Sequence, residues 1–321
     1  MLRLFRALTA ITCLAVAPAL AQTFPDHPIR IIVPQPPGGG FDLSARVVAD
    51  RLPAILGQPV IVENRPGAGT VVGSDVAAKS APDGYTMLLG GTSNMALNLG
   101  LYPKLAYDPV KDFKAVGLIV SWPFVLIGRK DLPQASIKDV VAYAKANPGK
   151  MTYASAGRGT GQHISAAVSF QLAGLDILHV PYSGAQPAYQ DILGGRVDLF
   201  FDNASTALPQ IKGNAVVPLA VSSANRYPVL PDLPTIKEAT GVDFNIDTWF
   251  GLFVPAATPA PVLEKLRAAL AQVVADPTVI EIFAKTGGSM SKLNAEQSEA
   301  FAKAEAAKWS KLVREAGITA E

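Results

Sequence analysis

The sequence predicts an α/β protein made of two lobes, each a mostly parallel sheet flanked by helices. Short runs of β-forming apolar residues alternate with amphipathic helical stripes along almost the whole chain, which is typical of parallel sheets covered by helices. The pattern passes through one such unit, then a second, and then returns to the first, so the chain is expected to cross between lobes more than once, as hinged proteins do. With 321 residues, it is long enough for two ordinary domains.

The first 21 residues are predicted to be a signal peptide. Arg3 and Arg6 precede an apolar run over 7–20, and Ala19-Leu20-Ala21 is a small-x-small cleavage site. The apolar run is too short to anchor the chain in a bilayer. The mature, exported chain is therefore expected to begin near Gln22, with no stable membrane anchor.

The charge balance argues against nucleic acid and anionic membranes as partners. The chain has 28 Lys and Arg against 26 Asp and Glu, and without Arg3 and Arg6 the balance is 26 to 26. A neutral protein has no bulk electrostatic attraction to either partner. Cys13 is the only cysteine and is interpreted as an apolar signal residue rather than a lipid-attachment site. The mature fold must then rely on its core rather than on disulfides.

The first lobe opens with alternating strands and helices. Strands are predicted at 29–33, 59–62 and 85–89, and helices at about 43–55 and 70–80. Pro53 is expected to end or kink the first helix, because an interior proline removes a hydrogen bond and clashes with the preceding turn. This βαβαβ order predicts a parallel doubly wound sheet.

A polar joint at 108–114 separates this unit from the next. The apolar run 118–127 is interpreted as a strand, interrupted at Trp122-Pro123, that crosses between the lobes. One lobe is expected to comprise residues 22–120 plus 236–321, with residues 121–235 as an inserted second lobe. The later elements are predicted in this order: helix 136–146, strand 151–154, helix 164–172, strand 177–180, helix 187–193, strand 197–201, helix 204–211, strand 216–221, an irregular segment 227–234, strand 248–254, and helices 263–274 and 295–316.

A glycine-rich turn, PPGGGFD, follows the first strand and opens the first helix. No Lys-Ser/Thr pair follows the glycines, and Leu43 stands where a dinucleotide fingerprint needs its third glycine, so neither nucleotide motif applies. Glycines let a ligand approach the backbone, and the first amides of a helix are unpaired donors at its positive end. The turn therefore favours a small anion, most simply a carboxylate. A plain tight turn capped by Asp42 remains the alternative.

Similar polar turns follow three other predicted strands. They lie at 90–94, at 157–162 and at 201–203. In doubly wound sheets, ligands bind beyond the carboxyl ends of the strands. Four such turns divided between two lobes predict one cleft between the lobes, and they favour the binding role of Gly38–Asp42 over the structural one.

Single side chains around these turns allow two interpretations each. His163 can donate to a carboxylate or can simply be a polar residue at a helix start. Arg158 can pair with a second carboxylate, although a solvated position on the rim is favoured. Trp249 is expected in the core rather than against a ligand. Tyr182 and the adjacent Ser183 follow a second-lobe strand and can reach the cleft.

Motifs for catalysis are missing from the sequence. It contains no G-x-S-x-G elbow and no H-E-x-x-H, and its three histidines are scattered, so no cofactor and no metal site are expected. The chain is therefore predicted not to be an enzyme. A remote alternative is an exported hydrolase that uses Ser44 or Ser155 with His163.

Several stretches together resemble a known family, the substrate-binding proteins of tripartite tricarboxylate transporters, also called the Bug family. They run from PIRIIVPQPPGGGFDLSAR through LGQPVIVENRPGAG, APDGYTMLLG, LYPKLAYDPVKDF, PGKMTYASAGRGTGQH and ILHVPYSGAQPAYQDILGGRVDLFFDN to WFGLFVPAATPAP. The resemblance implies a periplasmic receptor with a type II-like periplasmic-binding-protein (Venus flytrap) fold. Its two lobes close on a mono- or dicarboxylic acid and deliver it to a membrane permease. A monomer is expected because the cleft must open freely. A periplasmic sensor read by a membrane signalling partner is the alternative.

The resemblance also places the binding site. It implies ligand contacts through Gly39, Gly40, Asp42, Thr92, Ser93, Thr160, Gly161 and His163, with Asp202 holding water or loops. The predicted site is completed by Gln35, Phe41, Gly91, Arg158, Gly159 and Tyr182. Gln35 stands where the family usually has an aromatic residue, Phe41 where it has Thr or Ser, and Ser183 where it often has Lys. Phe41 therefore favours a ligand with an apolar or aromatic body.

Overall fold

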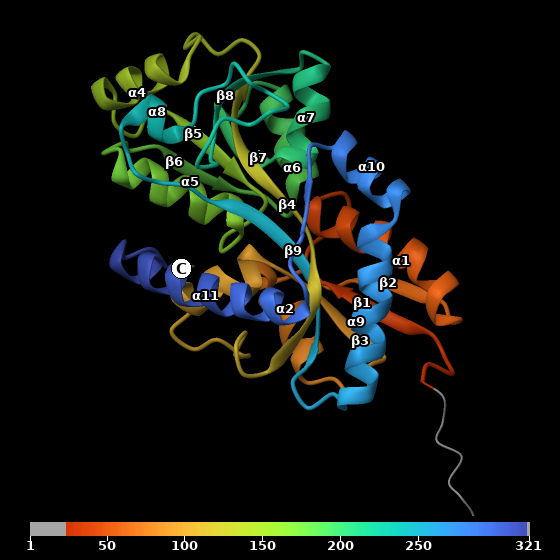
Figure 1. Ribbon diagram of the computed structural model, residues 1–321. Helices are drawn as coiled ribbons and strands as arrows, with labels where there is room; N and C mark the ends of the chain where they lie inside the picture. The colour runs from red at the N-terminus through yellow and green to blue at the C-terminus, as the bar shows by residue number, and fades with distance from the viewer. Residues whose placement is uncertain (1–23, 320–321) are drawn as a thin grey trace, which may run out of the picture.

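The computed structural model describes residues 24–319, so the predicted signal peptide lies outside the described residues. Ten strands of this part form one continuous sheet in two halves that share β4 (Phe113–Arg129) (Figure 1). The first half-sheet contains β2 (Val60–Asn64), β1 (Ile29–Val33), β3 (Thr86–Gly91), β9 (Asp247–Pro255), the N-terminal part of β4 and β10 (Ser289–Met290). The second half-sheet contains the C-terminal part of β4, β7 (Leu199–Asn203), β5 (Thr152–Ser155), β6 (Leu178–Pro181) and β8 (Val216–Val221).

The expected parallel unit at the start of the chain is confirmed. β1 lies between β2 and β3 and is parallel to both, with Ile31 opposite Val62 on one side and Met87 on the other. β9 returns late in the chain and pairs antiparallel with both β3 and β4. In the second half-sheet, β5 is parallel to β6 and β7. The exact division into lobes at residues 121 and 236 stays a prediction.

Helices cover both faces of the sheet. One buried apolar cluster joins side chains of α1, α6, α7, α9 and α10 to the sheet, and a second cluster joins those of α2, α4, α5 and α11 to its other face. The helices are α1 (Gly40–Leu56), α2 (Val71–Ala78), α3 (Asn98–Leu101), α4 (Ile137–Ala146), α5 (Gly161–Leu172), α6 (Ala185–Leu193), α7 (Ala204–Lys212), α8 (Ile236–Thr240), α9 (Ala260–Ala275), α10 (Pro277–Lys285) and α11 (Ala295–Glu315), with short turns η1 (Ala68–Thr70) and η2 (Thr92–Leu97, a π-helix).

The first helix does not end at Pro53, and the expected interruption of the long strand at Trp122-Pro123 is wrong. α1 runs past Pro53 to Leu56, because Leu52 and Leu56 continue its buried face and Gly57, in the left-handed region, ends it by donating to the Pro53 carbonyl. β4 is not interrupted at Trp122-Pro123. Pro123 is the last β4 residue paired with β9, and the next residue starts the pairing with β7. At such a change of partner strand, the missing N–H of proline is tolerated.

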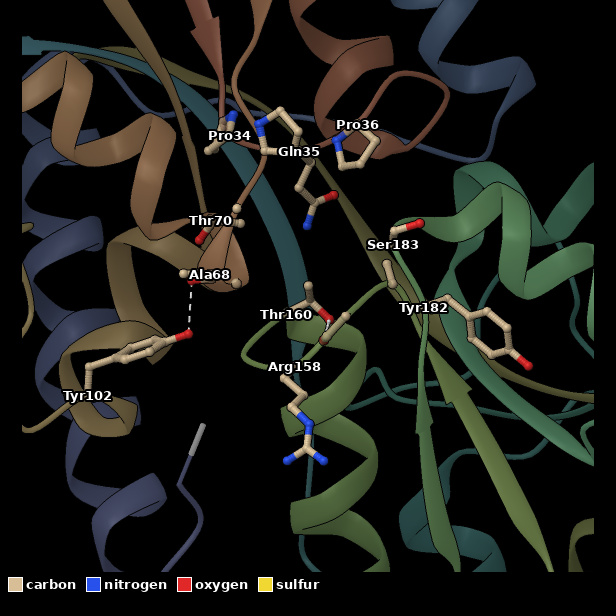
Figure 2. Close-up of a pocket in the computed structure, with 15 residues that line it drawn as sticks. Pro34, Gln35, Pro36, Ala68, Thr70, Tyr102, Arg158, Thr160, Tyr182 and Ser183 are labelled. Carbon is tan, nitrogen blue, oxygen red and sulfur yellow. Dashed lines mark hydrogen bonds between the residues drawn. The ribbon is translucent and has the colours of Figure 1, made fainter. Parts of the chain in front are cut away.

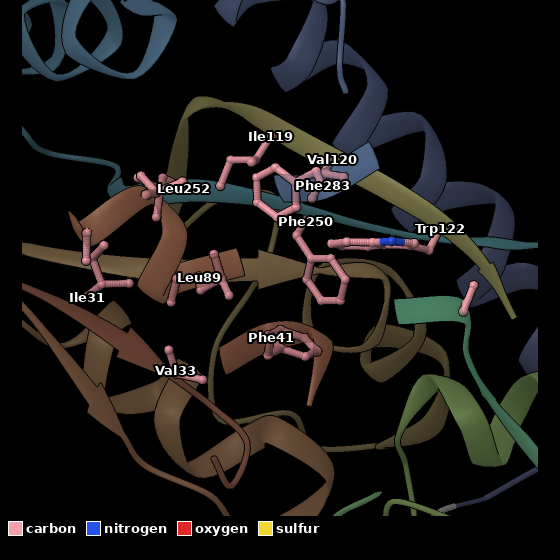
Figure 3. Close-up of a cluster of buried hydrophobic side chains, with 14 of the residues drawn as sticks. Ile31, Val33, Phe41, Leu89, Ile119, Val120, Trp122, Phe250, Leu252 and Phe283 are labelled. Atoms are coloured by element: carbon pink, nitrogen blue, oxygen red, sulfur yellow. The ribbon is translucent and has the colours of Figure 1, made fainter. Parts of the chain in front are cut away.

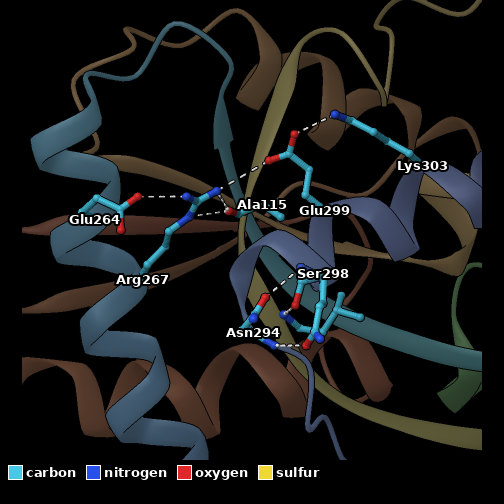
Figure 4. A network of polar contacts seen from close by, with 9 residues as sticks. Ala115, Glu264, Arg267, Asn294, Ser298, Glu299 and Lys303 are labelled. Atoms are coloured by element: carbon cyan, nitrogen blue, oxygen red, sulfur yellow. Dashed lines mark hydrogen bonds and ion pairs between the residues drawn. The ribbon is translucent and has the colours of Figure 1, made fainter.

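Aromatic side chains pack the core where α1 meets the first half-sheet (Figure 3). The rings of Phe41 and Phe250 meet edge to face at 4.7 Å, and Trp122 meets both Phe250 and Phe283 edge to face. Each of these four side chains is at most 3% exposed, and burying one aromatic ring stabilises a fold by roughly 1.5–3 kcal/mol. This cluster fixes the start of α1 against the sheet. No helix among residues 24–319 is both long and apolar enough to cross a membrane.

Candidate functional site

A cavity of about 650 Å³ lies between loops of the two half-sheets. Figure 2 shows it from close by, with Gln35 above and Thr160 and Arg158 below. The lining of this interlobe cavity consists of residues 34–36, 66–70 and Tyr102 on the first side, and of Ala156, Gly157, Arg158, Thr160, Tyr182 and Ser183 on the second. The predicted cleft between the two units is therefore present.

A much smaller pocket of about 10 Å³ lies deeper between the half-sheets, and we call it the inner pocket. That volume holds about one water molecule. Gln35 lines both spaces, so the inner pocket adjoins the interlobe cavity. The inner pocket is formed by Gln35, Gly40, Phe41, Ser93, Phe124, Gln162, Asn203, Thr248 and Phe250.

Helix α1 begins at the inner pocket without a side-chain cap. Its N-cap residue, Gly39, has extended backbone angles and no side chain that can accept a hydrogen bond from the first amides. By contrast, Thr160 caps α5 and Asn203 caps α7 through side-chain oxygens. The first N–H groups of a helix have no partner inside the helix and lie at the positive end of its dipole. The start of α1 therefore offers backbone donors suited to an anion.

Asp42 organises the glycine turn from inside. Its carboxylate accepts from the Gly38 amide at 3.1 Å, from Arg46 Nε at 2.9 Å and from Asn64 Nδ2 at 3.0 Å. Burial by itself would raise the pKa of Asp42, but these three hydrogen bonds outweigh it and hold the pKa below its ordinary value. The carboxylate is thus ionised and engaged within the turn, so its role is to shape the glycine loop.

Gln35 is a polar side chain of the first half-sheet that faces the cavity. It is only 7% exposed, and its side-chain amide makes no hydrogen bond with the described residues. In Figure 2 the amide nitrogen points into the cavity toward Thr160. The amide is open to the cavity, so a ligand there can accept its hydrogens.

The second glycine loop supplies the opposite wall. Thr160 is buried, donates to the Gly157 carbonyl at 2.7 Å and accepts from the His163 amide. Gly159 has φ +78°, and a Cβ there would lie 2.8 Å from the Tyr102 hydroxyl of the other side. Only glycine allows this approach. Gly161 donates to Ser93 Oγ at 2.9 Å, which is a direct contact between the two sides.

Arg158 is exposed at the cavity, as expected for a residue on the rim. Its guanidinium forms no ion pair with the described residues, and it is the one charged side chain among those that line the cavity. In Figure 2 it extends away from Gln35 along α5. It can therefore meet only a part of a ligand that is distant from Gln35.

His163 does not line the cavity, but stacks on His179 with ring centroids 4.0 Å apart. Burial, and secondarily the positive charge of Arg158, lowers the pKa of His163 to about 4. Burial, then His163 and Arg158, lowers the pKa of His179 to about 3. Both rings are therefore neutral near pH 7. The Nδ1 atom of His163 accepts from the Gly159 amide at 3.2 Å, so this histidine holds the glycine loop.

The pairings proposed for a hydrolase are wrong. Ser155 Oγ lies 2.7 Å from His179 Nε2 rather than against His163, and Ser44 donates to the Gly40 carbonyl of its own helix. Ser155 is fully buried, and a histidine with a pKa near 3 is a poor general base at neutral pH. No group of three or more His, Cys, Asp and Glu side chains in the part of the chain that the structure describes is placed to hold a metal ion.

Thr92 and Ser93 are adjacent but serve differently. Thr92 Oγ1 accepts from the Trp249 amide at 3.0 Å and donates to the Asp247 carbonyl, so its hydroxyl is used on β9. Ser93 lines the inner pocket, and its oxygen accepts from Gly161. Its hydroxyl hydrogen remains available. Gly91 is the last residue of β3, and its amide donates to Asn94 Oδ1. A Cβ at Gly91 would lie 2.7 Å from the Trp249 carbonyl.

Asp202 is fully buried behind the inner pocket. It accepts from Thr206 at 2.6 Å, from Tyr189 at 2.8 Å and from Gln162 Nε2 at 3.3 Å. Burial raises the pKa of this carboxyl above its ordinary value, although the hydrogen bonds oppose the rise. Asp202 thus ties together side chains of α5, α6 and α7 and fixes the orientation of Gln162, whereas its predicted role in holding water or loops stays a prediction.

Three aromatic residues lie differently from one another. Phe41 belongs to the core and touches only the inner pocket, so it does not form a wall of the interlobe cavity. Trp249 packs against Phe253 and Phe301, as expected for a core residue. Tyr182 lines the cavity, but its hydroxyl donates to Asp191 at 2.8 Å and its ring turns outward in Figure 2.

The loop 66–70 was missed by sequence reasoning, although it lines the cavity. Gly67, Ala68, Gly69 and Thr70 all have positive φ, with φ +82° at the β-branched Thr70. Such strain persists only where neighbours fix it. The Tyr102 hydroxyl donates to the Ala68 carbonyl at 2.9 Å, and Asn98 donates to the Gly69 carbonyl and to Thr70 Oγ1. Two glycines in the stretch RPGAG were the available signal.

Asn203 was also missed, although the turn that contains it was identified. Its Oδ1 accepts from the Ser205 amide at 2.9 Å, while its Nδ2 lies 2.9 Å from where a Cβ on Gly40 would stand. It therefore reaches from the second half-sheet to the start of α1. The sequence gives the position of this turn but not the direction of its side chains.

The chain matches the family described as tripartite tricarboxylate transporter family receptor, TctC, over residues 44–318. It is 36% identical to the protein BugT of Bordetella pertussis, over 94% of this chain and 93% of BugT. Among solved structures, an R. palustris protein with adipate superposes with a TM-score of 0.87 at 31% identity, covering 92% of this chain and 99% of that one. MatC from Rhodopseudomonas palustris with bound malate gives 0.85 at 31% identity, covering 90% and 100%.

Proposed function

Because this chain belongs to the tripartite tricarboxylate transporter receptor family, we propose that it is a periplasmic solute-binding protein. It captures a small carboxylate between its two half-sheets and hands it to a membrane permease, with no bond made or broken. We expect a monomer, since the two sides must separate to admit the ligand.

One observation supports carboxylate binding above the others. The start of α1 has no side-chain cap, and beside it Gln35, 7% exposed, holds an amide without a partner among residues 24–319. Backbone amides and a neutral amide together can hold a carboxylate without a buried cation. The ligand also binds the second glycine loop, so it favours the closed arrangement by its differential affinity.

The walls of the cavity indicate what lies beyond the carboxylate. Prolines at 34, 36 and 66, Ala68, Ala156 and two tyrosines make much of the lining apolar. An aliphatic or aromatic body is therefore favoured, on the basis of these residues rather than Phe41. Arg158, at the far side, is placed for a second carboxylate, and so it favours extended dicarboxylates over short ones.

The first experiment is a thermal-shift and calorimetric screen of residues 22–321 with acetate, malate, hexanoate, adipate, benzoate and terephthalate. A ligand that binds only the folded state at a hundredfold excess over its Kd stabilises it by about 2.7 kcal/mol. Hexanoate against adipate, and benzoate against terephthalate, measure the worth of the second carboxylate. If Arg158 contacts it, Arg158→Gln removes the preference within each pair and leaves the monocarboxylate affinity unchanged.

The site itself is tested by Gly39→Asp. An aspartate fits the extended backbone of an N-cap and occupies the α1 amides with its own carboxylate. We expect the melting temperature without ligand to stay the same or rise slightly, while carboxylate affinity falls by at least tenfold. In Gly39→Ala, the added methyl has room, with Gln35 Oε1 nearest at 3.7 Å, so binding should persist. Unchanged binding by Gly39→Asp would show that the carboxylate lies elsewhere.

Delivery needs a separate measurement. Deleting the gene in its own host should abolish uptake of the acid identified in the screen, and the unaltered gene should restore it. Tight binding with normal uptake in the deletion strain would favour sensing over transport.

A further inference from the structure

Asn203 lines the inner pocket and uses only one end of its side-chain amide. The oxygen caps helix α7, whereas the nitrogen makes no hydrogen bond with the described residues. Asn203 is 3% exposed. Its Oδ1 caps α7 by accepting from the Ser205 amide at 2.9 Å. This bond fixes the amide plane, so the Nδ2 group faces the other way, across the inner pocket toward Gly40. Nδ2 has no acceptor among residues 24–319.

Capping alone does not explain an asparagine here. Ser, Thr and Asp accept from helix amides about as well as Asn does and bring no buried NH₂ group. The Nδ2 group is open to the inner pocket rather than sealed inside the core. An occupant of the inner pocket can therefore accept a hydrogen bond from it.

The other groups around the inner pocket determine the charge of that occupant. The amides that begin α1 are donors without a cap. Ser93 Oγ already accepts from Gly161 at 2.9 Å, so its hydrogen is free to donate. Gln162 gives its Nε2 to Asp202 at 3.3 Å and turns its oxygen away from that carboxylate, which leaves one acceptor for a water or a ligand hydroxyl. Donors therefore predominate, and they come from both half-sheets.

We propose that Asn203 donates from Nδ2 to the ligand carboxylate at the start of α1, either directly or through one water molecule, for which the inner pocket has room. The inference rests on the proposed function and adds to it the group of the second half-sheet that reads the negative charge. Because Asn203 and α1 belong to different half-sheets, an anion held by both joins the two halves. Asn203 is thus a determinant of both specificity and closure.

Asn203→Asp tests this with a change of a single atom type. Aspartate keeps the cap on Ser205 and suits the positive end of α7, so the ligand-free protein should melt at an unchanged or slightly higher temperature. In the pocket it replaces a donor by a negative charge. We expect affinity for the carboxylates of the panel to fall roughly 30-fold or more, since a hydrogen bond to a charged group is lost. Asn214→Asp, at an exposed turn, adds the same charge away from the pocket and should bind normally.

A change of specificity separates this role from a structural one. The carboxamides hexanamide and benzamide offer donors in place of a carboxylate oxygen. Relative to hexanoate and benzoate, Asn203→Asp should bind them better than the wild type does. If the wild type binds carboxylates and Asn203→Asp binds them within twofold, this inference is wrong and the proposed function stands. If no acid in the panel binds the wild type, both fail.

Discussion

Polar residues at the strand ends differ in how much of their hydrogen-bonding capacity the fold has already used. The Thr92 hydroxyl makes its hydrogen bonds with the backbone of β9. The Asp42 carboxylate accepts from the glycine turn. Gln35 and Asn203 keep an amide group that has no partner in the described part of the chain. Among the residues that line the two cavities, unused hydrogen-bonding capacity therefore distinguishes the groups that we propose as ligand contacts.

Thr92→Val should destabilise the fold without weakening binding. Valine keeps the shape of threonine but leaves the Trp249 amide, now bonded at 3.0 Å, without its acceptor. We expect the free energy of unfolding to fall by about 1–3 kcal/mol, measured in urea, with ligand Kd changed less than twofold by calorimetry. Ser93→Ala, one residue on, should instead weaken binding. Loss of affinity in Thr92→Val at normal stability would return Thr92 to the ligand site.

Two buried histidines should make the fold sensitive to mild acid. In the unfolded chain they bind protons below about pH 6.5, but in the fold only near pH 4 for His163 and pH 3 for His179. The unfolded state therefore binds more protons below pH 6.5, and stability, full above that pH, falls as the pH drops toward 4. Each histidine contributes at most about 1.4 kcal/mol per pH unit.

Urea unfolding from pH 7.5 to 4.5 measures this dependence. The double variant His163→Asn, His179→Gln should lose stability less steeply than the wild type between pH 6.5 and 4.5. Carboxylates titrate in both proteins and cancel in the comparison. Equal slopes would mean that the two rings protonate freely within the fold.

At the scale of elements, the strained loop 66–70 and the loop 157–159 meet face to face across the cavity. A Cβ on Gly69 would lie 2.5 Å from the Arg158 carbonyl and 2.8 Å from the Tyr102 hydroxyl. Side chains essentially cannot approach a backbone carbonyl so closely. The absence of a Cβ at Gly69 therefore lets the two loops meet, and within the first side it also leaves room for the Tyr102 hydroxyl.

Gly69→Ala should weaken ligand binding more than its effect on stability explains. Gly57→Ala is the matched control. Both glycines have positive φ, +58° and +77°, but nothing lies within 4 Å of a Cβ at Gly57. Each alanine should cost about 1–2 kcal/mol through backbone strain. Only Gly69→Ala should also weaken ligand binding, by roughly tenfold or more, because it holds the loops apart. Equal affinities in the two variants would show that the loops need not meet.

For the whole molecule, the shared strand β4 has the largest consequence. It pairs with β9 as far as Pro123 and with β7 from Phe124 onward, so neither half-sheet is complete without it. Ser222, fully buried at this change of partner, accepts from the Phe124 amide at 2.8 Å and donates to the Ile246 carbonyl. When one half-sheet folds, it therefore also fixes the β4 strand on which the other half-sheet pairs.

The two halves should therefore unfold together. All three tryptophans, Trp122, Trp249 and Trp309, belong to the first half-sheet or to helix α11 beside it. Tryptophan fluorescence thus reports one side, whereas far-ultraviolet circular dichroism reports both. In urea we expect the two signals to change in one coincident transition. A circular-dichroism step that the tryptophans do not follow would reveal independent unfolding of the second half.

Much of this architecture could be predicted from the sequence. The spacing of hydrophobic residues and the position of turn residues determine where most helices and strands lie, and both are local properties of the chain. The strand 29–33 has the predicted bounds, and Ser136 caps α4 as expected. Strand pairing carries β4 through Pro123 against the local signal, and the buried Leu52 and Leu56 carry α1 past Pro53. The short α8 and α10 were not predicted, and Thr235 and Asp276 cap them with ordinary side-chain bonds.

The candidate site was predicted less completely than the fold. Glycine turns after strands identified the cavity and most of its walls, because their conformational need is visible in the residue type. Which oxygen or nitrogen faces the cavity depends on partners far along the chain, such as Asn64 for Asp42 and Trp249 for Thr92. Sequence order does not reveal these partners, and the loop 66–70 was missed for the same reason.

Ser183 lies exposed at the mouth of the cavity, and the only cysteine of the chain, Cys13, precedes residue 22. In a chain of residues 22–321, Ser183→Cys would thus be a single thiol, placed at the mouth of the proposed ligand cavity. A solvatochromic dye attached there would turn the protein into an optical reporter of its own occupancy, with which complex mixtures of organic acids can be searched by colour.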